Sequence, residues 1–445
     1  MQADVSLKTK FNQLIAIRDR LANTPLTSKL GVVQKVSSSM LVVAYSGLKL
    51  GDICFVPRNE AHERVFAEVI GTEKEIAYLA VLGDASGVGV GDLVVFSNKN
   101  ISFPFGEGLL GKILNGMGHV MDGVKPVGHF ENRASKQPAP SPMDRPLITE
   151  PLQTGLRSID GLLTLGRGQR IGIFGPAGTG KSSLLSSIAK KTDADVVVIG
   201  LIGERGREVR EFVQRHLPED VRKKIIIVAA TSDQPAMERV YAAHTATSIA
   251  EGFRDQGKSV LLMMDSLTRF ARALREIGLA AGEPPTRRGY PASVYPALPS
   301  LIERPGRTGK GDITAIYTVL VEGEVQSDPI AEEVRSLTDG HVILSQEMAN
   351  AGIYPAIDVS QSLSRMMSDI VPQQHSQAAN HFRSLLSKYN DIEMLLQIGE
   401  YKPGQDTEAD QAIALKPAKD AFVKQKSGEY QPIKDTVQNL VEMFQ

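Results

Sequence analysis

The sequence contains one cysteine, Cys54, and no tryptophan among its 445 residues. A single cysteine excludes an internal disulfide and a cysteine-based zinc site, and it is typical of a reducing compartment. Aromatic residues make up only 5% of the chain and the formal net charge is −1, so neither favours nucleic acid or an anionic membrane as a partner. No apolar run approaches the roughly 20 residues that span a bilayer, and the N-terminus lacks the apolar core of a signal peptide. These absences predict a cytoplasmic protein.

One segment fits the phosphate-binding pattern G-x-x-x-x-G-K-[ST], and it reads Gly175-Pro176-Ala177-Gly178-Thr179-Gly180-Lys181-Ser182. Residues 170–174 predict a buried strand before it, and residues 183–191, beginning with Ser183, predict a helix after it. The glycines let backbone N–H groups turn toward phosphates, and the helix N-terminus adds partial positive charge. In this pattern Lys181 reaches the β- and γ-phosphates and the Ser182 hydroxyl ligates Mg²⁺. The sequence therefore predicts a nucleoside triphosphate held by this loop and by Ser183.

Two carboxylates follow predicted strands in the same region. Asp265 ends the apolar run 259–265, where a phosphate-loop enzyme needs an acid that supports Mg²⁺ and its waters. Glu204 follows the run 196–202, in the crevice where such sheets bind ligands, and we expect it to orient the attacking water as general base. Glu208 competes for that role, but it lies four residues on and is expected to pair with Arg205 or Arg207. A solvated turn with mutual salt bridges is the alternative for this cluster.

Two further residues are ambiguous when considered alone. Arg365 is compatible with an arginine finger that stabilises the charge developing during phosphoryl transfer, but a structural salt bridge is the more common role of such an arginine. Tyr354, taken alone, is more typical of a core aromatic than of a stacking platform for the nucleotide base. Nothing in the local spacing separates these alternatives.

The length indicates two or three domains. Six short β-type runs within residues 29–100, separated by turns with Gly and Asp, predict a small β-barrel. Beyond an extended segment over 131–151, strand-like runs alternate with helical stretches, which predicts a mostly parallel sheet with helices on both faces. We therefore expect an α/β fold with an N-terminal helix over residues 1–25, a β-barrel over 26–100, a phosphate-loop NTPase domain over 101–368 and a helical domain over 369–445. The first helix either packs on its own domain or contacts neighbouring subunits or a partner.

Several motifs together resemble the ATPases of type III protein secretion, which comprise injectisome and flagellar-export enzymes related to the catalytic subunits of F-type and V-type ATPases. They lie at residues 203–209 (GERGREV), 265–269 (DSLTR), 288–291 (RGYP), 337–341 (LTDGH) and 354–358 (YPAID). The resemblance covers about residues 29–430, and the block 203–209 is specific to it. It implies a central RecA-like domain and a homohexameric ring with nucleotide between neighbours.

The resemblance also implies a role for each candidate residue. Lys181 and Ser182 would hold phosphate and metal, Glu204 would polarise water, Arg205 would lie near the γ-phosphate, Asp265 would support Mg²⁺, Tyr354 would stack on adenine, and Arg365 would cross from the adjacent subunit as the finger. The implied work is protein export, by releasing chaperones and unfolding substrates. The implied partners are a central stalk, peripheral stator proteins, chaperone–effector complexes and the export gate at the cytoplasmic face of the inner membrane, with no nucleic acid.

The chain departs from the family pattern at three positions. Gln346 stands where the family usually has Arg, which puts a local salt bridge in doubt, and Pro176 and Thr179 are less usual in the phosphate loop. A catalytic subunit of an ion-translocating ATPase is one alternative, although such chains typically have Thr in place of Gly206. A Rho-like RNA translocase would need aromatic platforms and basic residues in its barrel. A non-catalytic ring subunit would lack the carboxylate of Glu204. An injectisome enzyme is favoured over a flagellar one.

Overall fold

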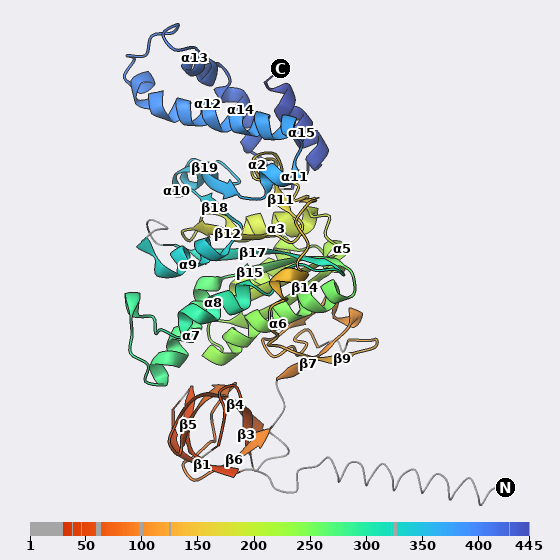
Figure 1. The fold of residues 1–445 in the computed structure, drawn as a ribbon, viewed down its shortest axis with the longest axis vertical. Helices are drawn as coiled ribbons and strands as arrows, with labels where there is room; N and C mark the ends of the chain where they lie inside the picture. The colour runs from red at the N-terminus through yellow and green to blue at the C-terminus, as the bar shows by residue number, and fades with distance from the viewer. Residues whose placement is uncertain are drawn as a thin grey trace, which may run out of the picture. The chain divides into compact units, whose positions relative to one another are not determined.

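The computed structural model describes residues 30–444 apart from positions 38, 46, 59–63, 98–100, 124–125, 322, 324–326 and 427 (Figure 1). The described chain divides into two compact units, one within residues 1–100 and one within residues 101–445. The helix expected over residues 1–25 lies outside the described residues.

The first unit contains a closed barrel of six antiparallel strands, so the predicted β-barrel is confirmed. Alternate side chains such as Leu41, Val43 and Leu79 are buried, because successive side chains of a strand point to opposite faces. Cys54 is also buried, and burial raises the pKa of its thiol to about 12, which makes it an unreactive core residue. The strands, in order around the barrel, are β1 (Leu30–Val36), β2 (Met40–Ala44), β5 (Ile76–Leu82), β4 (Arg64–Glu73), β3 (Ile53–Pro57) and β6 (Leu93–Ser97).

The second unit is built, in its described part, on a nine-stranded sheet. In order of neighbours across the sheet, the strands are β19 (Ile357–Ser364), β18 (Gly340–Leu344), β12 (Arg170–Gly175), β17 (Asp312–Leu320), β15 (Ser259–Asp265), β13 (Val196–Glu204), β14 (Ile225–Thr231) and β8 (Ile113–Leu114). Strand β16 (Gly306–Arg307) pairs with β17. All are parallel except β19 and β16, which confirms the mostly parallel sheet. Two short pairs join β7 (Ser102–Phe105) to β9 (Glu131–Ala134) and β10 (Pro151–Leu152) to β11 (Leu165–Gly166).

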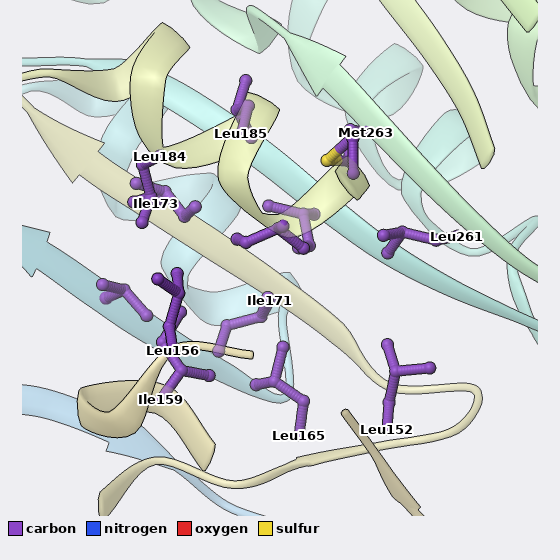
Figure 2. Close-up of a cluster of buried hydrophobic side chains, with 14 of the residues drawn as sticks. Leu152, Leu156, Ile159, Leu165, Ile171, Ile173, Leu184, Leu185, Leu261 and Met263 are labelled. Carbon is purple, nitrogen blue, oxygen red and sulfur yellow. The ribbon is translucent and has the colours of Figure 1, made fainter. Parts of the chain in front are cut away.

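One face of the sheet is covered by α3 (Lys181–Lys191) and the π-helical turn η3 (Phe212–His216). Figure 2 shows Leu184 and Leu185 of α3 in one buried cluster with Ile171 and Ile173 of β12 and with Met263 of β15. These strand residues are two apart, as the period of a strand requires. This packing fixes the first turn of α3 over the carboxyl end of β12.

The other face is covered by α6 (Ala236–Asp255), α7 (Leu267–Ala280) and α9 (Pro329–Leu337), and α8 (Val294–Ile302) packs on these helices. Helix α6 is buried on nearly all sides, and its run of small residues lets it lie close to the strands. Its Glu251 accepts two hydrogen bonds from the guanidinium of Arg304, at 2.9 and 2.8 Å, and both side chains are almost fully buried. A buried carboxylate is tolerated here because it is paired on both oxygens.

The C-terminal segment forms α12 (Gln373–Gln397), α13 (Thr407–Ala414), α14 (Lys416–Val423) and α15 (Ile433–Glu442). The sequence pattern does not predict α13, whose buried face consists of the small residues Ala409 and Ala412. Helix α2 (Arg157–Leu162) packs against α14 and α15, so these helices belong to the same compact unit as the sheet. The division of this unit at residue 368 stays a prediction. No helix of the described chain is long and apolar enough to cross a membrane.

The remaining helices are single turns or little more, and they connect the strands. They are α4 (Gly206–Glu211), α5 (Glu219–Arg222), α10 (Gln346–Asn350), α11 (Met367–Ile370) and the 3₁₀ turns η1 (Glu107–Leu109), η2 (Pro142–Asp144) and η4 (Arg287–Gly289).

Candidate active site

Three predicted site residues lie where parallel strands of the sheet end. Lys181 begins α3 after the loop that follows β12, Glu204 is the last residue of β13, and Asp265 is the last residue of β15. Strands β13 and β15 are neighbours, and only β17 separates β15 from β12. The carboxyl ends of parallel strands share one edge of a sheet, and open α/β sheets bind ligands there. The negative charges of Asp265 and Glu204 both act on the Lys181 ammonium, so the three side chains form one electrostatic cluster.

The phosphate loop has the backbone that the motif predicts. Gly178 and Gly180 both have φ of +84°, a left-handed conformation that favours glycine. A Cβ at Gly180 would also lie only 3.2 Å from the ring of Tyr354. Thr179 donates from its hydroxyl to the carbonyl oxygen of Pro176 at 3.0 Å, so the two unusual residues of this loop close it with a hydrogen bond to each other.

Lys181 is held against its own loop. Its Nζ donates to the carbonyl oxygens of Gly175 at 2.9 Å and Pro176 at 2.6 Å. Burial lowers the pKa of this lysine, and the charges of Asp265 and Glu204 oppose the shift. The hydroxyl-bearing residues Ser182 and Ser183, which follow in the first turn of α3, are exposed.

Asp265 is buried at this edge and has one partner from the intervening strand. The hydroxyl of Thr318 on β17 donates to Oδ1 of Asp265 at 2.6 Å. Burial raises the pKa of Asp265, while the Thr318 hydrogen bond and the Lys181 charge lower it. Thr318 is a site residue that the sequence reasoning missed, since a threonine inside an apolar strand carries no local signal.

Glu204 is half-buried beside Arg269, whose Nε lies 4.0 Å from its Oε1. Gly203 has φ of +68°, and a Cβ there would lie 3.1 Å from the Cβ of Arg269, so both the turn and the close approach require glycine. Burial, the charge of Asp265 and a hydrogen bond with Glu208 raise the pKa of Glu204 to about 8, against the opposing charge of Arg269. This carboxyl group therefore gains and loses its proton near neutral pH.

Arg205 and Glu208 form the ion pair that the sequence predicts. Their side chains meet at 3.7 Å, and that of Arg205 is 73% exposed. Gln346, which replaces the family's usual arginine, is exposed and donates to the Asn350 side chain at 3.0 Å within α10. An uncharged glutamine cannot form a salt bridge, and at this position it forms the hydrogen bond with Asn350 instead.

A cavity of about 460 Å³ adjoins the phosphate loop. This volume is in the range of small-molecule sites. Tyr354 lines it with 43% of its surface exposed, so this ring is not a core aromatic. Another part of the lining, which was not predicted, comes from the segment after α14. The lining of this cavity also includes Thr179, Gly180 and Ser183 of the phosphate-loop region and Lys424, Gln425 and Lys426 of the segment after α14.

Arg365 lies beside the amino end of β12, at the edge of the sheet opposite the one formed by the carboxyl ends of the parallel strands, where the phosphate loop lies. It follows the last residue of β19, and its backbone N–H donates to the carbonyl oxygen of Asp339 at 3.0 Å. The N–H of Asp339 in turn donates to the carbonyl oxygen of Arg170, the first residue of β12. The phosphate loop begins at the other end of this strand, at Gly175. At 3.3 Å per residue β12 separates the two edges by roughly 17 Å. The Arg365 guanidinium is exposed and makes no hydrogen bond or ion pair with any described residue.

Magnesium fits this edge only in the company of a nucleotide. Within the described residues, no group of three or more His, Cys, Asp or Glu side chains could hold a metal ion. Mg²⁺ usually keeps several waters and takes one or two protein oxygens beside substrate phosphates. The Ser182 hydroxyl and the Asp265 carboxylate are oxygens of that kind, next to the loop that suits phosphates.

Comparisons with known proteins agree with this geometry. The family described as "ATP synthase alpha/beta family, nucleotide-binding domain" matches residues 155–364, and the "T3SS EscN ATPase C-terminal domain" matches residues 371–442. The chain is 48% identical over 423 residues to a type 3 secretion system ATPase of Xanthomonas euvesicatoria, covering 95% of this chain and 96% of the relative. It is 44% identical over 426 residues to a flagellum-specific ATP synthase of Bacillus subtilis, covering 96% and 97%.

Solved structures agree as well. The assembled ATPase EscN from the type III secretion system of enteropathogenic E. coli is 41% identical, with a TM-score of 0.88 over 93% of this chain and 99% of that one. EscN in complex with its central stalk EscO matches with a TM-score of 0.85. With such identity over nearly its whole length, the chain belongs to the type III secretion ATPases and is an ATPase with the nucleotide-binding domain of the ATP synthase alpha/beta family.

Proposed function

We propose that this ATPase hydrolyses Mg·ATP at the edge formed by β12, β13 and β15, and that hydrolysis drives protein export through a type III secretion system. The observation that carries this proposal is the convergence of Lys181, Glu204 and Asp265 beside the cavity lined by Tyr354. Relatives named as type 3 secretion and flagellum-specific enzymes support ATP-driven export as the work of the family.

The phosphate loop is proposed to bind the triphosphate through the backbone N–H groups of residues 177–183, since Pro176 has no N–H. Lys181 would exchange its two carbonyl partners for phosphate oxygens, because an ammonium forms stronger hydrogen bonds with anionic oxygens than with neutral carbonyls. Magnesium, held by Ser182 and Asp265, would neutralise phosphate charge as it develops. Thr318 favours the ionised form of Asp265 by donating to Oδ1, against the effect of burial.

Glu204 is proposed to orient the attacking water and take up its proton. Its raised pKa suits that task, because a base works best when its pKa is near the working pH. Arg205, one residue on, is proposed to turn from Glu208 toward the γ-phosphate. The exposure of its side chain leaves it free to do so.

The cavity beside Tyr354 is proposed to hold adenine, with the exposed ring as the stacking platform. Lys424, Gln425 and Lys426 form a further wall of the same cavity. In this proposal the C-terminal segment completes the nucleotide site. A partner that displaces the C-terminal helices would therefore also displace one wall of that site.

Arg365 is proposed to act as an arginine finger for the neighbouring subunit. Its place at the opposite edge of the sheet from its own phosphate loop keeps it out of its own site. A homohexameric ring, in which each interface joins one subunit's Arg365 to the next subunit's Lys181, satisfies both positions. The relative EscN has been solved in an assembled form, which supports a ring here.

At the level of the secretion apparatus, we propose chaperone release and substrate unfolding in an injectisome, on the cytoplasmic side of the inner membrane. A central stalk is the partner that the EscN–EscO complex supports by analogy. Stator proteins, chaperone–effector complexes and the export gate are the further partners proposed from the family resemblance, and nucleic acid is not among them.

The test is the rate of ATP hydrolysis per subunit against protein concentration, at fixed Mg·ATP and low salt, with Lys181→Ala as the blank. A steep rise is expected, because active sites form only where subunits meet. A flat profile from a species that sizing identifies as a monomer would overturn the shared site. Activity in Lys181→Ala equal to the wild type would overturn the phosphate-loop assignment itself.

A further inference from the structure

A second cavity in the same unit is lined by a buried lysine whose ammonium has no hydrogen-bond partner among the described residues. Lys419 of α14 is only 1% exposed, yet its Nζ has no hydrogen-bond partner among the described residues. Buried lysines are rare and are nearly always paired, because removing an ammonium from water is costly unless something replaces the water. Neither the phosphate loop nor the cavity beside Tyr354 uses this residue.

Lys419 lines a cavity of about 450 Å³. The cavity lies between α12, α14 and the segment that contains α10 and the start of β19, and it is distinct from the cavity beside Tyr354, with which it shares Lys424. Its size is that of a small-molecule site. Much of the lining is apolar, from Ile353, Ile357, Val359, Phe382, Leu386 and Val423.

None of the described acids that line this cavity accepts a hydrogen bond from Lys419. Asp420 is the one negative group whose charge acts on this lysine, and both of its carboxylate oxygens accept from Nζ of Lys416 at 2.6 Å. Asp358 accepts hydrogen bonds from Ser360 and Gln361 instead. Burial and the charge of Lys416 lower the pKa of Lys419 to about 8. The remaining acids of the lining, Glu347 and Glu393, are exposed.

We propose that this cavity binds a small organic acid, whose carboxylate pairs with the ammonium of Lys419 and whose apolar body lies against Phe382, Leu386 and Val423. A carboxylate supplies the hydrogen-bond acceptor that the Lys419 ammonium lacks, and its negative charge strengthens that hydrogen bond. An apolar body suits the rest of the lining, and an occupant would lie directly beside Lys424 at the wall of the neighbouring cavity.

The probe is sodium hexanoate, titrated calorimetrically into the full-length ATPase at pH 7, with hexan-1-ol as the uncharged probe of the same length. Hexanoate is expected to bind at least about tenfold more tightly than hexanol, because a charge-assisted hydrogen bond distinguishes them. Lys419→Met keeps the length of the side chain and removes its charge, and it is expected to abolish this preference. Lys434→Met, which removes an exposed lysine on α15, is the matched control and is expected to keep it.

The proposal is overturned if hexanoate does not bind the wild type, if it binds no better than hexanol, or if Lys419→Met retains the preference. The comparison of the two probes on the wild type needs no variant, so it decides the question even if Lys419→Met fails to fold. None of these outcomes depends on ATP hydrolysis, because no nucleotide is present.

Discussion

The backbone N–H of Gln425 donates to the carbonyl oxygen of Tyr354 at 2.9 Å, which fastens the segment after α14 to the loop that carries the exposed tyrosine ring. The Gln425 side chain adds two more ties. Its Oε1 accepts from the N–H of Arg157 at 3.0 Å, and its Nε2 donates to the carbonyl oxygen of Gly155 at 2.9 Å. One wall of the cavity beside Tyr354 is thus held by the residues that begin α2.

Arg157→Ala is expected to weaken ATP binding without slowing hydrolysis of bound ATP. The Arg157 guanidinium donates to the carbonyl oxygens of Phe422 at 2.8 Å and Lys424 at 2.6 Å and pairs with Glu429, so its loss frees the segment that forms this wall. The KM for ATP should rise about tenfold with kcat nearly unchanged, as expected when about 1.4 kcal/mol of ordering is lost. Steady-state kinetics measures both constants.

Inorganic tripolyphosphate separates the base pocket from the phosphate loop in this experiment. It has no base, so its inhibition constant should be the same in Arg157→Ala and wild type. Arg215→Ala is the matched control, because Arg215 is an exposed arginine that pairs with Glu211 one turn away. An unchanged KM in Arg157→Ala would contradict a role for this wall, and loss of tripolyphosphate inhibition would indicate general damage.

The site residues that directly follow a predicted strand were predictable, whereas their partners from other segments were not. Lys181, Glu204 and Asp265 each follow an apolar run that reads as a strand, and parallel strands bring their carboxyl ends together. The barrel and the sheet were predictable for the same reason, since their buried faces repeat with the period of a strand. Local pattern therefore located this edge of the sheet.

Arg157, Thr318 and Gln425 show the limit of that reasoning. Thr318 lies in a strand like any other threonine, and Gln425 follows a short helix more than 240 residues after the phosphate loop. Their contacts depend on which strand lies between β12 and β15 and on where α14 packs, and neither is encoded in neighbouring residues. Helix α13 escaped detection because its buried alanines give only a weak apolar face.

Thr318→Val is expected to raise the pKa of Asp265, because it removes the hydroxyl that donates to the ionised carboxylate at 2.6 Å. Burial already raises this pKa, and the hydrogen bond opposes that effect. The acidic limb of the pH profile of kcat/KM should therefore move to higher pH, with a loss of roughly two- to tenfold on that limb and recovery at higher pH. A uniform loss at all pH values would instead point to a packing defect.

Glu204 should produce a rise in kcat/KM with increasing pH. Its pKa of about 8 in the free enzyme means that the carboxylate needed as base accumulates only as pH rises through that value. Arg269 holds the pKa down, so Arg269→Gln should move the rise to higher pH. Glu204→Gln should lose about 10²- to 10⁴-fold in kcat and still bind ADP. Retained turnover in Glu204→Gln, or a rise that Arg269→Gln leaves in place, would exclude Glu204 as the base.

Mixed rings test whether Arg365 and Lys181 meet across an interface. Arg365→Ala and Lys181→Ala should each be inactive alone, the first for want of a finger and the second for want of a phosphate ligand. Because Arg365 lies at the opposite edge of the sheet from its own phosphate loop, an interface in a mixed ring can combine an intact Lys181 with an intact Arg365 from the next subunit. Activity should therefore reappear on mixing and should peak near equal proportions. Mixing Arg365→Ala with the double variant Lys181→Ala/Arg365→Ala is the control, since it leaves no intact finger. Equal activity in both mixtures, or none in either, would show that Arg365 does not act on a neighbour's site.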